Sequence, residues 1–165
     1  MAAINQWTAP KSWIGGEVAK AAKLNEQLRD NLTWLKSRPF VAGATGAVTT
    51  TSATFVTMTN STVNLTTTGG YILFWATGYY FNSAGGLGTF DLAIDGLRQG
   101  HATFGTTLLQ GLLANYNDNL NIMMITGGGA GGSLLAAGAH TCSLQWYVNS
   151  GTGNVDLKIF AMELC

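Results

Sequence analysis

The sequence contains few charged residues, and this scarcity limits what its surface can do. Only 10% of the 165 residues are charged, eight of them basic and eight acidic, where a typical soluble domain has roughly a quarter. Residues 1–40 hold six basic and three acidic residues, a net charge of +3, so the other 125 residues carry only seven charges. A lone monomer with such a surface would tend to self-associate. We therefore expect identical neighbours or a larger assembly to cover much of it.

Long apolar runs and targeting signals are also lacking. No uninterrupted run of about 18 apolar residues occurs, so no membrane-spanning helix or membrane insertion is predicted. The first seven residues lack the basic start and apolar core of a signal peptide, which favours synthesis in a cytoplasm. The two cysteines, Cys142 and Cys165, form neither a CxxC nor a zinc pattern, and we expect both to be reduced.

The sequence lacks recognisable motifs for nucleotide binding and for nucleophilic catalysis. The run Gly127–Gly132 has no Lys-Ser/Thr after it and precedes a strand pattern, whereas a phosphate-binding loop opens a helix. Ser143 has no GxSxG context, and nothing near Cys142 indicates an activated thiol. A polysaccharide hydrolase would need two carboxylates about 5–9.5 Å apart, which the sequence does not indicate. We predict no catalytic residue and no enzyme activity.

Metal and nucleic-acid sites are equally poorly indicated. His101 and His140 belong to no HxH or HExxH pattern and fit histidines at the rim of a sheet. Asp91 and Asp95 flank a turn, where calcium binding is the alternative to an ordinary turn role. Acidic residues interrupt the basic residues of the N-terminal stretch, as on a solvated helix face. The prediction is no metal, no cofactor and no nucleic-acid partner.

The clearest strand pattern runs from His140 to Asn149. Alternate residues of a strand face opposite sides, so one face would carry the apolar side chains Cys142, Leu144, Trp146 and Val148. After a turn-forming cluster, Val155–Leu164 alternates too, and the two segments predict a C-terminal hairpin. From Phe160 the apolar phase changes, which indicates either a bulge or an end buried on both faces.

Residues 40–139 contain further short strand patterns separated by Gly and Asn turns. Tyr71–Phe81 is the most apolar run and predicts a central strand, buried on both faces or covered on one by a subunit. Asp95-Gly96 predicts a tight two-residue hairpin turn. We expect about eight strands in an antiparallel all-β sandwich. The aromatic residues of the central run fit core packing better than a sugar-stacking platform.

The N-terminal stretch predicts an extended arm followed by a helix. Trp7, Pro10, Trp13 and the Gly15-Gly16 pair give residues 1–16 too much turn chemistry for a helix. A helix is predicted from Glu17 to Ser37, where Arg38-Pro39 ends it. Its heptad-like seam consists of Val18, Ala21, Asn25, Leu28, Leu32 and Leu35. The seam indicates self-association with Asn25 fixing the register, and the alternative is a helix packed on its own β-domain.

Two resemblances extend this interpretation. The segment Trp7–Asn31 resembles the N-terminal segment of many small virion proteins of tailed bacteriophages, with the pattern W-x-x-P-x-x-W-x-x-G-E followed by A-A-x-L-N-x-x-L-R-D-N. Here Val18 directly follows Glu17, a one-residue departure from that pattern. The resemblance implies a virion component whose N-terminal segment joins the particle or its sister subunits. The pattern is carried by Trp7, Pro10, Trp13, Gly15, Glu17, Leu24, Asn25, Leu28, Arg29, Asp30 and Asn31.

The region after residue 40 resembles the trimeric jelly rolls of the C1q and tumour-necrosis-factor type. The resemblance rests on Gly70–Tyr79, on the Asp95-Gly96 turn and on Leu135–Trp146. It implies a homotrimer whose axis is lined by apolar and aromatic side chains. The expected β-domain core and trimer axis comprise Tyr71, Phe74, Trp75, Leu144, Trp146 and Val148.

Together these observations predict an all-β antiparallel jelly roll at 40–165, preceded at 1–39 by an anchoring arm (Trp7, Pro10, Trp13, Gly15, Glu17) and one α-helix. The predicted function is that of a non-enzymatic homotrimeric virion protein, a capsid decoration or head fibre that binds the major capsid protein or another virion protein. The alternative is a tail-fibre or baseplate component that binds a host receptor or glycan. In either case the protein would be made in the host bacterial cytoplasm and located in the virion.

Overall fold

The computed structural model describes residues 11–12, 14–18, 20–32, 38–103, 105–110, 114, 117–127 and 134–164. The chain divides into two compact units, Met1–Arg38 and Pro39–Cys165. Each unit is described by itself.

Among its described residues, the N-terminal unit contains a helix. It begins as α1 (Ala21–Leu24) and continues as the π-helical segment η1 (Asn25–Asp30). The predicted start at Glu17 is wrong, because the backbone N–H of Glu17 donates to Ile14 O (3.0 Å) in a turn. Gly16 makes this turn with φ +85°, and the Glu17 carboxylate pairs with Lys11. Glu17 therefore closes a turn before the helix.

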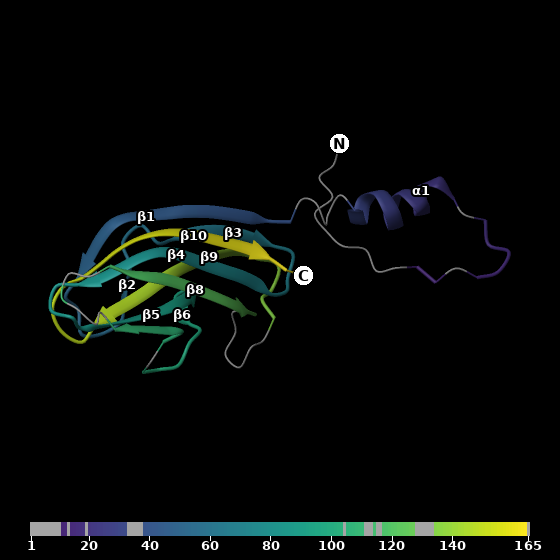
Figure 1. The fold of residues 1–165 in the computed structure, drawn as a ribbon. Helices are drawn as coiled ribbons and strands as arrows, with labels where there is room; N and C mark the ends of the chain where they lie inside the picture. Colours follow the sequence, from purple (N-terminus) through teal and green to yellow (C-terminus); the bar gives the residue numbers. More distant parts are fainter. Residues whose placement is uncertain are drawn as a thin grey trace. The chain divides into compact units, whose positions relative to one another are not determined.

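The C-terminal unit is a sandwich of two antiparallel sheets (Figure 1). One sheet has the order β1-β10-β4-β8, and the other has β2-β9-β5-β6, with β3 also paired to β9 and β7 to β5. Apart from the two-residue β2 and β6, the orders are β1-β10-β4-β8 and β3-β9-β5-β7, which is the jelly-roll arrangement. The predicted all-β jelly-roll fold is confirmed. The strands are β1 (Phe40–Thr50), β2 (Val56–Thr57), β3 (Val63–Thr67), β4 (Ile72–Asn82), β5 (Leu87–Ile94), β6 (Leu97–Arg98), β7 (Thr107–Gln110), β8 (Asp118–Thr126), β9 (Gly138–Val148) and β10 (Gly153–Glu163).

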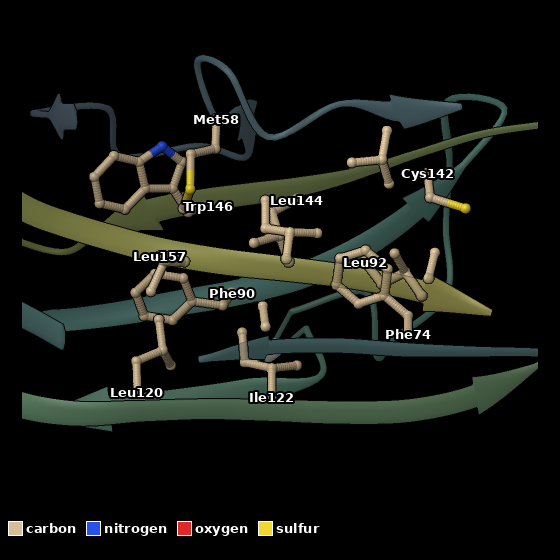
Figure 2. Packing of buried hydrophobic residues seen from close by; sticks show 14 of the residues in the cluster. Met58, Phe74, Phe90, Leu92, Leu120, Ile122, Cys142, Leu144, Trp146 and Leu157 are labelled. Carbon is tan, nitrogen blue, oxygen red and sulfur yellow. The ribbon is translucent and has the colours of Figure 1, made fainter. Parts of the chain in front are cut away.

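Alternate side chains of both sheets form the core between the layers. In β9, the four apolar side chains predicted to share a face are buried there: Cys142, Leu144, Trp146 and Val148. Figure 2 shows Leu144 and Trp146 in one cluster with Phe74 of β4, Phe90 of β5 and Leu157 of β10. The Phe90 and Trp146 rings stack at a centroid distance of 5.9 Å. Both sheets thus contribute aromatic and aliphatic side chains to a single apolar layer.

The predicted C-terminal hairpin is wrong. β9 pairs with β5 and with β2 and β3, whereas β10 pairs with β1 and β4 in the other sheet. Each strand has a continuous apolar face, and placing the strands in opposite sheets buries these faces in the same core. Turn residues between two strands do not show whether the strands pair or cross between sheets. β10 also keeps an unbroken register with β4, so no bulge explains the phase change at Phe160.

Two further segments show where local chemistry predicts structure and where it does not. The Asp95-Gly96 turn is confirmed: Ile94 pairs with Leu97, and the turn residues have φ of 51° and 81°, as a type I′ hairpin requires. By contrast, no strand was predicted at β1. Its register shifts between Ala44 and Gly46, where Thr45 is inserted as a bulge that interrupts the alternation.

Replacing a core leucine tests this packing. Leu144→Ala should lower the free energy of unfolding by about 2–5 kcal/mol, because Leu144 is fully buried and its truncation leaves a cavity. The matched control Leu134→Ala, at an exposed position, should change it by less than about 0.5 kcal/mol. Urea denaturation monitored by circular dichroism measures both. Equal losses in the two variants would contradict the assigned core.

Candidate assembly surface

The outward side of the β1-β10-β4-β8 sheet, called the outer face below, is the main candidate for a functional surface. Strand pairing places its side chains in cross-strand rows. Two neighbouring rows are almost wholly apolar: Phe40, Met162, Leu73 and Ile125 form one, and Ala42, Phe160, Trp75 and Met123 form the next. An apolar patch thus crosses all four strands.

Much of this patch is exposed in the single chain. Met123 is 70% exposed, Ile125 61%, Phe40 57% and Trp75 42%. The Phe160 ring lies between the other two aromatic rings, with centroids 6.1 Å from Phe40 and 5.4 Å from Trp75. A contiguous surface of this kind marks an interaction site more often than isolated exposed apolar residues do.

The rest of the outer face is mixed in character. Tyr79 and Phe81 stack with centroids 6.3 Å apart, and the Trp75 indole N–H donates to Asn121 Oδ1 at 2.6 Å. Asp156 and Lys158 point outward from β10 in the rows of Tyr79 and Thr77. The face therefore has an apolar half beside a half with amides, two aromatic rings and two opposite charges.

The six residues predicted for the β-domain core and trimer axis are found in two environments. Phe74, Leu144, Trp146 and Val148 are buried in the core of the single chain. Tyr71 and Trp75 are 40% and 42% exposed, and Trp75 belongs to the outer face. Only these two are available to line an interface.

Sequence reasoning did not assign the exposed residues Phe40, Met123 and Ile125 to a surface. In hindsight, the sequences of β8 and β10 carry a signal for Met123, Ile125 and their neighbour Phe160. Met123 and Ile125 make the β8 sequence apolar in both phases of the alternation, and Phe160 does the same near the end of β10. A sandwich strand that is apolar in both phases of the alternation has an apolar face on the outer side of its sheet as well as one in the core.

The predicted seam of the N-terminal helix is exposed where the structure describes it. Val18 is 78% exposed, Leu28 59% and Leu32 60%, and Ala21 and Asn25 are exposed as well. The π-helical geometry of η1 departs from the 3.5-residue spacing that a regular heptad seam requires. Self-association through the seam stays a prediction. Gly15 and Glu17 of the predicted arm lie in the turn before the helix, and Trp7, Pro10, Trp13 and Leu35 lie outside the described residues.

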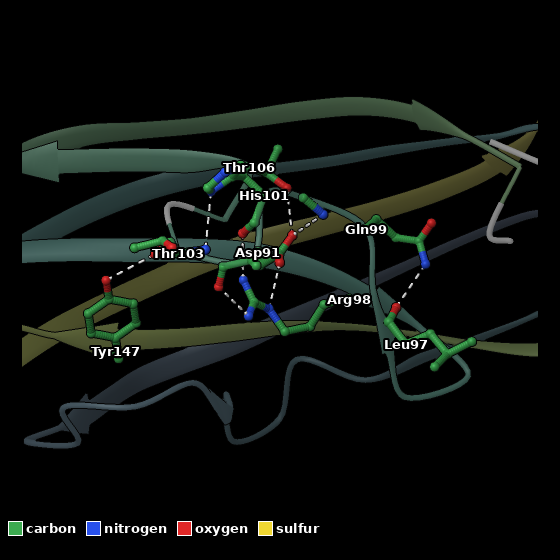
Figure 3. Close-up of polar contacts among 10 residues, drawn as sticks. Asp91, Leu97, Arg98, Gln99, His101, Thr103, Thr106 and Tyr147 are labelled. Atoms are coloured by element: carbon green, nitrogen blue, oxygen red, sulfur yellow. Dashed lines mark hydrogen bonds and ion pairs between the residues drawn. The ribbon is translucent and has the colours of Figure 1, made fainter. Parts of the chain in front are cut away.

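Asp91, the first of the two aspartates considered for calcium, is buried in a structural network (Figure 3). Arg98 Nε donates to its Oδ2 at 2.7 Å, and Gly100 N and Thr106 Oγ1 donate to its Oδ1 at 2.9 and 2.8 Å. The Arg98 guanidinium also donates to the carbonyls of His101 and Ala102 and lies 3.4 Å above the Phe55 ring centroid. These contacts hold the segment between β6 and β7 against the sheet, so the carboxylate serves the fold.

Asp95, the second aspartate, contacts His140 of the neighbouring strand β9 in the same sheet. His140 Nδ1 lies 2.7 Å from Asp95 Oδ2, and His140 Nε2 lies 2.9 Å from Ala136 O. Both neighbouring oxygens are acceptors, so only the imidazolium form, with a proton on each nitrogen, can donate to both at once. Thr141 N donates to the other oxygen of Asp95 at 2.8 Å. The cluster therefore joins the β5-β6 turn to the start of β9.

The electrostatics of the pair agree with this geometry. Burial by itself lowers the pKa of His140, but hydrogen bonds to Asp95 and Ala136, and the charges of Asp95 and Glu163, outweigh it and raise the pKa. Burial by itself raises the pKa of Asp95, but hydrogen bonds from Thr141 and His140 outweigh it and lower the pKa. No hydroxyl or thiol nucleophile contacts the ring in the hydrogen bonds of the described residues. The arrangement is that of a structural ion pair.

The remaining candidates for reactivity or metal binding among the described residues are also poorly suited to those roles. Cys142 is a buried free thiol whose pKa is raised by burial to about 11, which disfavours a nucleophilic role. Within the described ranges, no three His, Cys, Asp or Glu side chains gather as a metal site. None of the described helices is long and apolar enough to cross a membrane.

Comparisons with known proteins add little to this description. No family model matches the chain, and no curated protein matches its sequence. One similar solved structure is that of Eiger TNF from S. frugiperda, with 14% identity, a TM-score of 0.39, and coverage of 78% of this chain and 94% of that one. Another is a family 35 carbohydrate binding module from an environmental isolate, with 10% identity, a TM-score of 0.33, and coverage of 78% and 94% respectively. At these scores neither likeness adds to what the strand order shows.

The ion pair predicts a pH-dependent stability. The pKa of His140 is raised from its ordinary value of 6.5, so its contribution to stability is full below pH 6.5 and is lost as the pH rises through the folded-state pKa. The pKa of Asp95 is lowered from its ordinary value of 3.8, so its contribution is full above pH 3.8 and is lost as the pH falls through the folded-state pKa. His140→Gln should therefore reduce the free energy of unfolding more at pH 5 than at pH 8.5, by up to about 1 kcal/mol for a partly exposed pair.

A double-mutant cycle with Asp95→Asn isolates the pair, because asparagine tolerates the positive φ of this turn position. Denaturant unfolding at the two pH values measures the coupling. A coupling energy that is the same at pH 5 and pH 8.5 would contradict the charged form of the bridge.

Proposed function

We propose that this chain is a non-enzymatic structural protein of a virion that assembles as a homotrimer through the outer face of its jelly roll. The N-terminal arm and helix attach it to the capsid or to another virion protein, and the β-domain projects outward as a decoration or head fibre. The observation that carries the assembly is the exposed apolar patch across β1, β10, β4 and β8.

The composition of the chain supports self-assembly as the use of this patch. The unit Pro39–Cys165 contains only two basic residues, Arg98 and Lys158, so it has little charge with which to keep an apolar surface in solution. A specific interface needs about 800 Å² buried per partner, and a patch spanning the width of a four-stranded sheet is suited to that scale. The outward alanines of β1, among them Ala42 and Ala44, permit another copy to approach the sheet closely.

The attachment role is supported by the sequence pattern of Trp7–Asn31, which resembles N-terminal segments of phage virion proteins. The exposed apolar side chains of its described part, Ile14, Val18, Leu24 and Leu28, are suited to contact with a partner surface. Their exposure is compatible with contacts to sister helices as well as to the capsid.

A tail-fibre or baseplate component that binds a host glycan is the second candidate. It is favoured by the stacked Tyr79 and Phe81 rings on the mixed half of the outer face, beside amide side chains. This use requires the face to be free of other copies. The oligomeric state of the chain therefore separates the two candidates.

Placing charge in the patch tests the assembly. Met123→Asp combined with Ile125→Asp should convert a trimer into a monomer, because three copies would each bring two unpaired carboxylates into an apolar contact. Light scattering at micromolar concentration measures the mass, and circular dichroism checks the fold. Leu97→Asp is the control, since Leu97 is 62% exposed at a hairpin turn off this sheet. A trimer that survives the double substitution, or a monomeric natural chain, would contradict the proposal.

Removing the arm tests the attachment. A chain that lacks residues 1–16 should keep its trimeric mass and lose incorporation into virus particles by at least about tenfold, as expected when an anchor worth more than about 1.4 kcal/mol is removed. Immunoblotting of purified particles against the free protein measures incorporation. Undiminished incorporation would place the anchor elsewhere in the chain.

A further inference from the structure

The outer face carries two charged side chains among its described residues, and they are adjacent on the same strand. Asp156 and Lys158 lie two positions apart in β10, so both point to the outward side. The strand pairing places Ala47 and Tyr79 beside Asp156, and Ala44 and Thr77 beside Lys158. Neither charge therefore has an opposite charge next to it on a neighbouring strand.

Most other charges of the β-domain are used within the chain. Asp118 is the exception, because its Oδ2 is buried and has no hydrogen-bond partner among the described residues. Arg98 pairs with Asp91, and Asp95 pairs with His140. Glu163 is buried and accepts hydrogen bonds from the backbone and hydroxyl of Thr68. By contrast, no hydrogen bond or ion pair of the described residues involves the side chain of Asp156 or Lys158.

From this arrangement we propose that Lys158 of one copy pairs with Asp156 of the next copy, and that this pair fixes the register in which the outer faces pack. The inference rests on the proposed assembly through that face. Each copy brings one charge of each sign, so a closed ring forms one pair at every contact. Leaving two charges unpaired beside a buried apolar contact is unfavourable, whereas pairing them between copies offsets part of the cost of desolvating them. A slipped or reversed register brings like charges together and is disfavoured.

Charge-reversal variants of the full chain test the pairing. Lys158→Asp and Asp156→Lys should each raise the concentration at which half of the chains are trimeric by at least about tenfold, because each puts like charges at every contact. The swapped double variant Asp156→Lys/Lys158→Asp should restore the natural value, since it recreates the pair with reversed polarity. Sedimentation equilibrium measures these concentrations, and circular dichroism verifies folding.

A control separates local pairing from net charge. The double variant Thr62→Asp/Thr66→Asp adds the same two negative charges as Lys158→Asp, at exposed positions in and before β3 of the other sheet. It should leave the trimer unchanged.

The outcomes distinguish failure of the Lys158–Asp156 pairing from failure of the assembly through the outer face. Single reversals without effect, or a swapped variant no better than the single variants, would overturn the pairing while Met123→Asp/Ile125→Asp still tests the face. A natural chain that is monomeric would overturn the assembly itself and the pairing with it.

Discussion

Burial of one apolar face of each sheet against the other determines the structure of the β-domain. Tyr80 shows how closely the layers approach: a Cβ atom added to Gly88 of the facing sheet would lie 2.6 Å from its ring. The ring has that space because position 88 is glycine, and its hydroxyl donates to Gly86 O at 3.0 Å and accepts from Asn82 Nδ2 at 3.2 Å. A large aromatic side chain is thereby buried with its polar atom satisfied. The same demand explains why β9 and β10 lie in opposite sheets, where their apolar faces meet.

The outer face is apolar for a reason that folding of the single chain does not provide. Phe160 and Met123 add no contact to the core between the sheets, because alternation sends them to the opposite side of their strands. In a domain with a normal charge content, these positions would carry charged or polar residues. The proposed assembly accounts for their apolar character, because other copies would then cover these side chains after the chain folds.

Local patterns predicted strands well and predicted their partners poorly. The alternation of β9 and the Asp95-Gly96 turn depend on neighbouring residues and were read correctly from them. The strand β1 was not predicted, because its Gly and Ala residues have low strand propensity and Thr45 interrupts the period. The contact of His140 with Asp95 joins residues 45 positions apart, and the local sequence around either residue does not predict it. Sheet partners and ion pairs are set by which apolar faces are buried together, a property of the whole chain.

The few charges of the β-domain fit burial between its two sheets together with the proposed burial of the outer face between copies. At the ends and edges of the sandwich, charged groups serve the fold: Arg98 and Asp91 hold one loop, and His140 and Asp95 join a turn to a strand. These pairs leave little charge for solubility. In the proposed assembly, a charge on the outer face is acceptable only where a neighbouring copy can neutralise it. Asp156 and Lys158 offer that complementarity on one strand. The scarcity of charge on this surface supports the proposed assembly. Within that assembly, a single pair of charges is sufficient to select one register among many apolar ones.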